Sequence, residues 1–344
     1  MSLTIADLFS TPDYYPMAFD AGDTVFATMN RASYARSVFL DGRIARTTPD
    51  NIRAPNAALA TMHARTRLPR QRIGWIFHVA HCGSTLLARA LDRPDGPLVL
   101  REPMMLRQLG VTAGGSRDAV WRDRLDLTLA LAGRRYRPDA PTIIKANVPV
   151  NFIIPDIMAA AASDPAILLY YPFEIYLLAI LRTPNHRGWV QSVTTELRSF
   201  LSATVGDIAG LDAVERAAAL WLAQMLIYAD TLASCPNSYS LDAETLFAHP
   251  QAVIAAASTL FESPMTGQQI VALVASELFA TNAKNPGMAF DNAARLARQA
   301  ERAHGMADDI VRARQWLAHA PALARLPPAL DRALLGAGAP LLIG

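Results

Sequence analysis

The stretch 81–85 combines the residue types of an anion-binding turn. Gly83 lets the backbone approach a ligand closely, and Ser84 and Thr85 add hydroxyl donors beside it. An apolar run precedes this stretch and a helical pattern follows it. The N–H groups of the turn and of the helix N-terminus would then point at one negatively charged group. We predict an anion site, with a plain capped turn as the alternative, formed by His81, Cys82, Gly83, Ser84 and Thr85.

Two further polar residues follow short apolar runs and are candidates for chemistry. Glu102 comes after the run 97–100, and Lys145 ends the run 141–145. Ligands bind at the carboxyl ends of the strands in open α/β sheets, so both residues should lie beside the turn. There a carboxylate can accept the proton of an acceptor hydroxyl, and an ammonium can stabilise charge on a leaving oxygen. The alternatives are an ion pair of Glu102 with Arg101 or Lys145, and a solvated lysine.

Other polar side chains near these motifs have simpler interpretations. His81 is either a cationic ligand of the transferred group or a structural histidine, and the sequence leaves both open. His78 reads as a core histidine, and Cys82 as a small buried residue and not a nucleophile. Asn147 is a weaker candidate for a ligand contact, and Lys284 reads as a surface lysine.

Strand-length apolar runs alternate with helical patterns from residue 73 onward. This alternation predicts an α/β fold, a three-layer sandwich with a central, mainly parallel sheet and a helical C-terminal half. The predicted strands are 73–80, 97–100, 141–145, 166–170 and 238–241. The predicted helices are 84–91, 118–132, 153–162, one after Pro172, 212–233, 250–261 and 267–279. We expect one domain over 1–344, with an N-terminal extension (1–70), a core (71–262) and a helical C-terminal segment (263–344).

Composition narrows the class of protein. The 344 residues are 52% hydrophobic and 18% charged, which excludes a disordered chain. A net charge of +2 without a basic tract indicates no nucleic-acid or membrane partner. Two cysteines give no disulfide framework and no zinc cluster, so no metal site is predicted. The apolar segment 166–181 is shorter than a membrane span and the start lacks a signal-peptide pattern, so we expect a cytoplasmic protein.

The order of these motifs resembles the sulfotransferases that use 3′-phosphoadenosine 5′-phosphosulfate (PAPS). The family's turn reads Pro-Lys/Arg-Ser-Gly-Thr-Thr, and residues 80–85 of this chain, Ala-His-Cys-Gly-Ser-Thr, align with it. The segment 100–103, Leu-Arg-Glu-Pro, matches the place where tyrosylprotein-type members carry a catalytic glutamate. The segments Lys-Ala-Asn at 145–147 and Leu-Asp-Ala-Glu-Thr-Leu at 241–246 complete the set. The likeness covers roughly residues 73–262 and extends to uncharacterised bacterial sulfotransferase-like proteins.

The resemblance implies a function and its residue roles. The enzyme would transfer a sulfuryl group from a PAPS-type nucleotide to a hydroxyl or amine of a small-molecule or peptide acceptor. The turn from His81 to Thr85 would hold the donor, Glu102 would be the base and Lys145 would assist the leaving group. At the family's 3′-phosphate positions this chain has Tyr170-Tyr171-Pro172 and Leu178, so the identity of the donor stays open.

Two rival functions remain at this point. The first is a phosphotransferase that uses a nucleoside triphosphate. Its pattern G-x-x-x-x-G-K-[ST] is not met, because His78 occupies the first glycine position and Ser84 the lysine position. The second is a catalytically inactive member of the fold that binds a nucleotide or a partner. The acceptor and the oligomeric state are not defined by the sequence.

Overall fold

The centre of the molecule is a sheet of five parallel strands. The computed structural model describes residues 3–66 and 70–342; the end of the N-terminal extension at 67–69 lies outside these ranges. The strand order is β5-β6-β4-β7-β8. The strands are β4 (Ile73–His78), β5 (Leu98–Arg101), β6 (Thr142–Lys145), β7 (Ala166–Tyr170) and β8 (Ser238–Asp242). The predicted α/β class and parallel sheet are confirmed.

The strands form where the sequence has continuous apolar runs. Every residue of β4, β5, β6 and β7 is buried. Strands covered on both faces by helices need no polar side, so their sequences do not alternate. The register pairs Lys145 with Arg101 on one side and with Ile76 on the other. It therefore brings the carboxyl ends of β5, β6 and β4 to the same edge.

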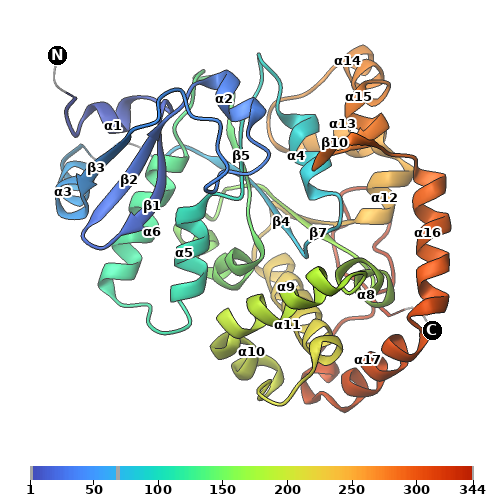
Figure 1. The fold of residues 1–344 in the computed structure, drawn as a ribbon. Coiled ribbons are helices and arrows are strands. Elements are labelled where there is room, and N and C mark those ends of the chain that lie inside the picture. The colour runs from blue at the N-terminus through green and yellow to red at the C-terminus, as the bar shows by residue number, and fades with distance from the viewer. Residues whose placement is uncertain (1–2, 67–69, 343–344) are drawn as a thin grey trace.

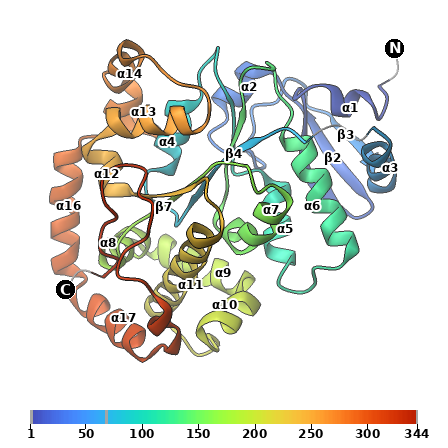
Figure 2. The ribbon, with the colours of Figure 1, turned by 180° about the vertical axis from the view of Figure 1, so that it is seen from behind.

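Helices cover both faces of this sheet, as expected for three layers. Figures 1 and 2 show α4 and α13 on one side of the strands and α7 and α11 on the other. The helices between residues 84 and 260 are α4 (Ser84–Leu91), α5 (Met104–Thr112), α6 (Ala119–Ala132), α7 (Ile154–Ala160), α8 (Phe173–Ile180), α9 (Pro184–Glu196), α10 (Arg198–Val205), α11 (Ala213–Ser234), α12 (Ala243–Ala248) and α13 (Pro250–Leu260). The predicted bounds of α4, α6, α7, α11 and α13 are confirmed to within a few residues and α8 follows Pro172 as expected, whereas α5, α9, α10 and α12 were not predicted individually. A 3₁₀ turn, η1 (Val148–Ile153), precedes α7 and lies almost entirely before the predicted helix.

The long helix α11 is apolar because it is central. Asp212 and Glu215 form a capping box at its start, and Trp221 and Met225 are completely buried. The indole N–H of Trp221 donates to the carbonyl of Tyr171 at 3.0 Å. Among the described residues it is the one helix whose length and composition would suffice to cross a membrane, and 72% of its most apolar stretch is buried inside the protein. Packing in the core accounts for its hydropathy.

The N-terminal extension forms a second, antiparallel sheet and then reaches the main one. Its elements are α1 (Asp7–Ser10), β1 (Tyr14–Asp20), β2 (Asp23–Thr28), α2 (Arg31–Arg36), β3 (Asn51–Pro55) and α3 (Asn56–Thr66). After α2, the N–H of Leu40 donates to the carbonyl of Arg101 at 2.7 Å. The Arg101 side chain bonds the carbonyl of Ser37 at 2.6 Å and the carboxylate of Asp92 at 2.6 Å. These bonds hold Phe39 near the carboxyl ends of the strands.

The C-terminal segment is not entirely helical, which corrects the prediction. It contains α14 (Gly267–Val274), α15 (Glu277–Ala280), β9 (Thr281–Asn282), β10 (Asn285–Ala289), α16 (Asn292–Gly305), α17 (Ala307–His319) and the 3₁₀ turn η2 (Pro321–Arg325). The sequence Asn-Pro-Gly at 285–287 cannot continue a helix; the chain turns at residues 283–284, and 285–287 begin the second strand of a short hairpin. Arg89 of α4 donates to the carbonyl of Ala283 at 2.9 Å and fixes the hairpin above the main sheet.

Candidate functional site

The turn between β4 and α4 has an unusual backbone. Ala80, His81 and Gly83 all have positive φ, at 67°, 52° and 81°. Left-handed residues alternating with ordinary ones aim successive N–H groups at one point, as in anion-binding nests. Non-glycine residues adopt this conformation at a cost, so the surrounding packing must impose it. A Cβ on Gly83 would also lie 2.8 Å from Cζ of Phe247.

Most N–H groups of this turn are free to bind a ligand. The N–H of Ala80 donates to Nδ1 of His78 at 3.0 Å. The N–H of Ser84 lies against the Cys82 sulfur. Within residues 3–66 and 70–342, no acceptor takes the N–H groups of His81, Cys82, Gly83 and Thr85. Four N–H groups of the predicted anion cradle are therefore available for a ligand's acceptor atoms.

The side chains of the turn divide into hydroxyls and a core thiol. Ser84 and Thr85 are buried, and the Thr85 hydroxyl has no hydrogen-bond partner among the described residues. A buried hydroxyl without a partner costs free energy, and an anion in the cradle would accept its hydrogen. The Cys82 side chain is fully buried, and burial raises the pKa of its thiol to about 11. Cys82 can therefore contact a ligand only through its backbone.

Glu102 and Lys145 form an ion pair at the carboxyl ends of β5 and β6. The Lys145 ammonium donates to Oε1 of Glu102, while Arg101 pairs with Asp92 instead. Glu102 adopts φ 59°, and its N–H donates to the carbonyl of Lys145 at 2.7 Å. Lys145 is fully buried, whereas the Glu102 side chain keeps 25% of its surface exposed. The acid faces the open side of the site and the lysine lies beneath it.

His78 is a core residue, as predicted, yet it belongs to this site. It is buried, and its Nε2 lies 3.8 Å from Oε1 of Glu102. Burial, followed by the charge of Lys145, holds its pKa well below the usual value. Because Nδ1 accepts the N–H of Ala80, the proton of the neutral ring is on Nε2 and faces Glu102.

The Phe39 ring from the N-terminal extension lies among three cations. The Lys145 and Lys284 ammonium groups are 5.6 Å and 5.8 Å from its centroid, and the Arg43 guanidinium is at 4.7 Å. Lys284 comes from the β9–β10 hairpin, so the first and last parts of the chain meet over this ring. Lys284, read as a plain surface lysine from the sequence, is solvent-accessible but is part of the site.

A second group of basic residues adjoins His81. Nη2 of Arg182 is 3.4 Å from Nδ1 of His81, and the His186 ring centroid is 4.5 Å from that of His81. A guanidinium only donates, so Nδ1 of His81 must accept and the ring proton lies on Nε2. Burial and then the charges of Lys284 and Arg182 lower the pKa of His81 to about 2. This pKa favours a neutral His81 when no ligand is bound, and a cationic His81 beside a bound anion stays a prediction.

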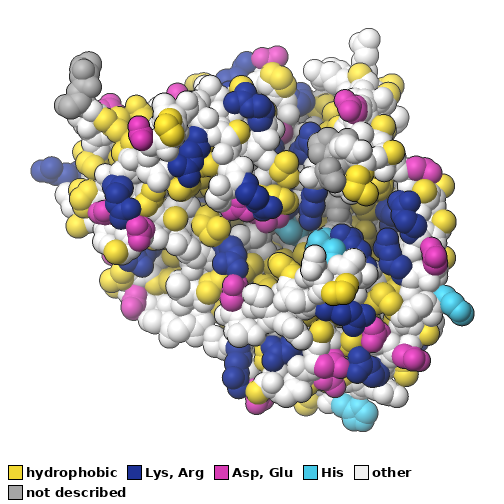
Figure 3. All heavy atoms as spheres, in the orientation of Figure 1, with side chains coloured by type: hydrophobic (Ala, Val, Ile, Leu, Met, Phe, Trp, Pro, Cys, Tyr) yellow, Lys and Arg dark blue, Asp and Glu magenta, His cyan; other side chains and the backbone are white. Residues whose placement is uncertain are grey.

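The lowered pKa values of two further basic groups indicate an excess of positive charge in the candidate site. Loss of hydration and then the charge of Lys145 lower the pKa of Lys284 to about 8. Loss of hydration and then Arg182 lower the pKa of His186 to about 4. Figure 3 shows histidine, lysine and arginine side chains around a hollow in this face of the molecule. Cations crowded together destabilise one another unless an anion joins them.

The structure brings together the sequence candidates and adds others. The turn 81–85, Glu102 and Lys145 meet at one sheet edge. No sequence pattern marked Phe39, Arg182 or His186, which lie far from the turn in the chain. The residues Asn-Pro-Gly at 285–287, a sequence typical of turns, were the one signal beside Lys284 that could have drawn attention to it. No group of three or more His, Cys, Asp or Glu side chains in the described part of the chain is placed to hold a metal ion.

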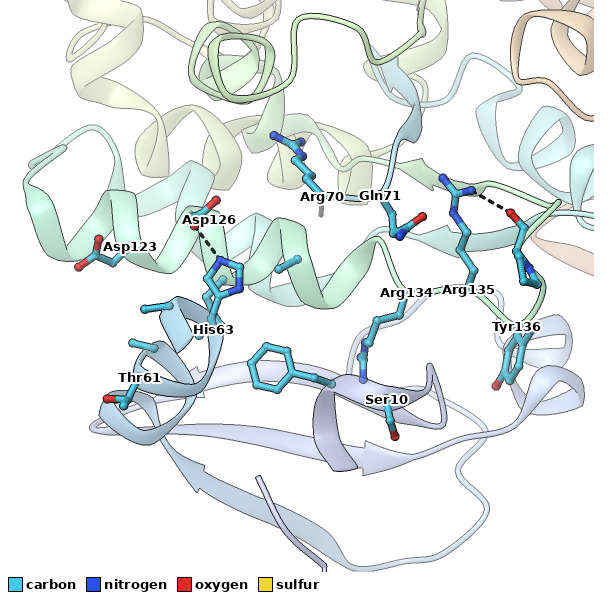
Figure 4. A pocket seen from close by; sticks show the side chains of 16 residues that line it. Ser10, Thr61, His63, Arg70, Gln71, Asp123, Asp126, Arg134, Arg135 and Tyr136 are labelled. Atoms are coloured by element: carbon cyan, nitrogen blue, oxygen red, sulfur yellow. Dashed lines mark hydrogen bonds and ion pairs between the residues drawn. The ribbon is translucent and has the colours of Figure 1, made fainter. Parts of the chain in front are cut away.

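A hollow of about 1170 Å³ lies elsewhere, beside Arg70 just before β4. Figure 4 shows its lining, with His63 bonded to Asp126 at 2.8 Å. The buried Arg134 in this wall donates to the carbonyls of Leu131, Leu8, Thr11 and Tyr14. These bonds tie α6 to the N-terminal extension, so the guanidinium serves the fold. We therefore place the candidate site at the turn after β4.

The conformation of the turn gives a first prediction. Gly83→Ala should lower the free energy of unfolding by about 2–4 kcal/mol, because a Cβ at positive φ is strained and meets Phe247. Urea denaturation would measure it. Gly188→Ala is the control: it lies in α9 with no atom within 4 Å of the added Cβ and should raise stability by about 0.5–1 kcal/mol. Equal effects of the two substitutions would contradict a strained turn.

The pKa of Lys284 gives a second prediction. Lys284 is charged below pH about 8 and neutral above it, so sulfate binding should weaken as pH rises through about 8. The groups facing it are Lys145, Glu102, Cys82 and Arg182. Calorimetric titration with sulfate from pH 6 to 10 should show a Kd that is flat at first and then rises by up to about tenfold per pH unit.

Lys284→Arg is the matched control for this titration. Arginine keeps its charge over the whole range, so the variant should bind sulfate with a Kd that stays flat past pH 8. A flat profile in the unaltered protein, or the same rise in both proteins, would show that Lys284 does not contact the anion.

Known proteins offer no direct guide to this site. A scan against protein-family models and a search of curated proteins found no match to this chain. A function for the site must therefore come from its residues and their geometry.

Proposed function

We propose that the protein is a transferase that moves a sulfuryl group from a PAPS-type nucleotide to a hydroxyl or amine acceptor. The observation that carries the proposal is the turn 81–85, with four free N–H groups, beside an excess of cations and a single partly exposed carboxylate. This combination suits a ligand with a phosphosulfate next to an acceptor that must lose a proton. The resemblance of the motif order to PAPS-dependent sulfotransferases supports the same reaction.

The turn would hold the 5′-phosphosulfate of the donor. The N–H groups of His81, Cys82, Gly83 and Thr85 would donate to its oxygens, together with the Thr85 hydroxyl. Donors fixed in the backbone need no reorganisation as charge develops, which favours the transition state over the ground state. The His81 Nε2 proton would add one neutral donor.

Glu102 is placed to act as the base. The acceptor oxygen or nitrogen attacks sulfur, and its proton passes to the Glu102 carboxylate. The bond between sulfur and the bridging phosphate oxygen breaks, and adenosine 3′,5′-bisphosphate leaves with the electron pair. The partial exposure of Glu102 supports this role, because an acceptor can reach the carboxylate from solvent.

The geometry favours different roles for the two lysines than the resemblance implied. Lys145 is buried and bonded to Glu102, so we assign it to hold that carboxylate in position. Lys284 is accessible on the open side of Phe39, so we assign it to the charge on the leaving oxygen. The acceptor would be a small molecule or peptide, and we place the reaction in the cytoplasm.

A phosphotransferase is the second candidate, because a crowded set of cations also suits a nucleoside triphosphate. Ser84 stands where such enzymes carry the lysine that contacts the β- and γ-phosphates. The cations of this site come from the hairpin and from the segment after α8 and not from the turn itself. This arrangement favours the sulfuryl reaction over ordinary triphosphate chemistry.

The choice of nucleotide can be tested by thermal unfolding. We expect adenosine 3′,5′-bisphosphate to raise the Tm clearly and ATP with magnesium to raise it less at equal concentration, because the tighter ligand stabilises more. Gly83→Ala, which closes the cradle, should reduce the shift with the bisphosphate. A larger shift with ATP–magnesium would favour the phosphotransferase, and no shift with either would overturn nucleotide binding.

The role of Glu102 can be tested by substitution. Glu102→Gln keeps the shape and a hydrogen bond to Lys145 but removes the base, so turnover should fall about 10²–10⁴-fold. Bisphosphate affinity should stay within about threefold. The assay would follow ³⁵S transfer from labelled PAPS to a panel of phenols, alcohols and amines. Glu102→Asp should retain part of the activity, and full activity in Glu102→Gln would remove this residue from the base role.

A further inference from the structure

The cations near His81 form a group separate from the Glu102–Lys145 pair. Arg182 follows α8 and His186 is in the first turn of α9, so neither side chain comes from α4 or from the turn before it. Arg182 is exposed to solvent, and its guanidinium makes a 3.4 Å contact with Nδ1 of His81. A guanidinium facing a neutral ring keeps most of its donors for another partner.

Helix α16 supplies a further arginine from the C-terminal segment. Its half-buried face carries Arg295 and Arg302, seven residues apart and therefore on one side of the helix. Arg295 pairs with both oxygens of Glu244 and lies 4.4 Å over Phe247, the ring that contacts the turn at Gly83. Arg302 lies two turns further along the same face, and α16 packs against α8. This packing brings it toward Arg182.

Arg182 and Arg302 have no carboxylate partner in the described ranges. No carboxylate there lies within ion-pair distance of Arg182, Arg302 or His186. By contrast, Arg187 in the same segment pairs with Asp309 at 2.5 Å, and Arg295 pairs with Glu244. Arg182 lies beside the cradle at His81, and Arg302 lies on a helix that packs against α8.

The charges of these groups act on one another. Partial desolvation and then the charge of Arg302 lower the pKa of Arg182, and Arg302 also helps to lower the pKa of His186. Like charges held together without a counter-ion indicate that a ligand supplies the missing negative charge. Tyr170 and Leu178, which align with the family's 3′-phosphate residues, are buried and carry no positive charge, so they do not form such a site here.

We infer that Arg182 after α8, His186 of α9 and Arg302 of α16 form a second anion subsite that takes a phosphate group distinct from the one held by the turn. The bidentate donors of arginine suit a phosphate dianion. The phosphate is either a second one on the nucleotide or a free one. The nucleotide version rests on the proposed function, and the subsite itself does not.

The test measures binding of two nucleotides that differ by one phosphate. Adenosine 3′,5′-bisphosphate and adenosine 5′-monophosphate would be titrated calorimetrically into the unaltered protein, Arg182→Ala, Arg302→Ala and Arg298→Ala. Arg298 is exposed on the same helix and is the matched control. We expect Arg182→Ala to weaken the bisphosphate about tenfold or more, Arg302→Ala to weaken it less, and both to leave the monophosphate within about twofold. Arg298→Ala should change neither.

A second titration separates the sources of the phosphate. Orthophosphate would be titrated into the same four proteins with saturating adenosine 5′-monophosphate present, or alone if no nucleotide binds. Orthophosphate binding that is lost in Arg182→Ala, without any preference for the bisphosphate, would establish the subsite for a free phosphate. The same loss in a protein that binds no nucleotide would keep the subsite and overturn the proposed donor. Equal binding of all probes by the unaltered protein and Arg182→Ala would overturn the inference.

Discussion

The turn from β4 to α4 forces three of four successive residues into the left-handed region, and the site is arranged around that turn. Ala80 and His81 adopt this conformation without being glycine, so the buried strand before them and the helix after them must impose it. The result is a row of N–H groups for which residues 3–66 and 70–342 supply no acceptor. In the proposed function an anion would accept these hydrogen bonds and offset part of the cost of the left-handed conformation.

Several cations of the site also lack a carboxylate partner among the described residues. Lys145 forms an ion pair with Glu102, whereas Lys284, Arg182 and Arg302 form none with a carboxylate among the described residues. On the same helix as Arg302, Arg295 pairs with Glu244. The cations without an ion pair at this site lie near the turn whose N–H groups have no acceptor in the described ranges.

The site also explains the two additions to the central sheet. The N-terminal extension bonds to the end of β5 through Leu40 and brings Phe39 over the ion pair. The C-terminal segment returns through the β9–β10 hairpin and α16, which bring Lys284 and Arg302 to the same side. Segments far apart in the chain thus cover a site whose base is formed by the sheet. These segments supply cations to the candidate site and partly cover it.

The sequence by itself determined the parallel sheet, the turn and the edge at which Glu102 and Lys145 lie. These features follow from local patterns: continuous apolar runs mark strands buried on both faces, and the carboxyl ends of parallel strands meet. Only the tertiary structure decided that a neutral His81 is favoured when no ligand is bound, that Lys145 is buried beneath Glu102, and that Arg182 and Lys284 join the site. Protonation and burial depend on neighbours from distant parts of the chain, and no local pattern records which neighbours those are.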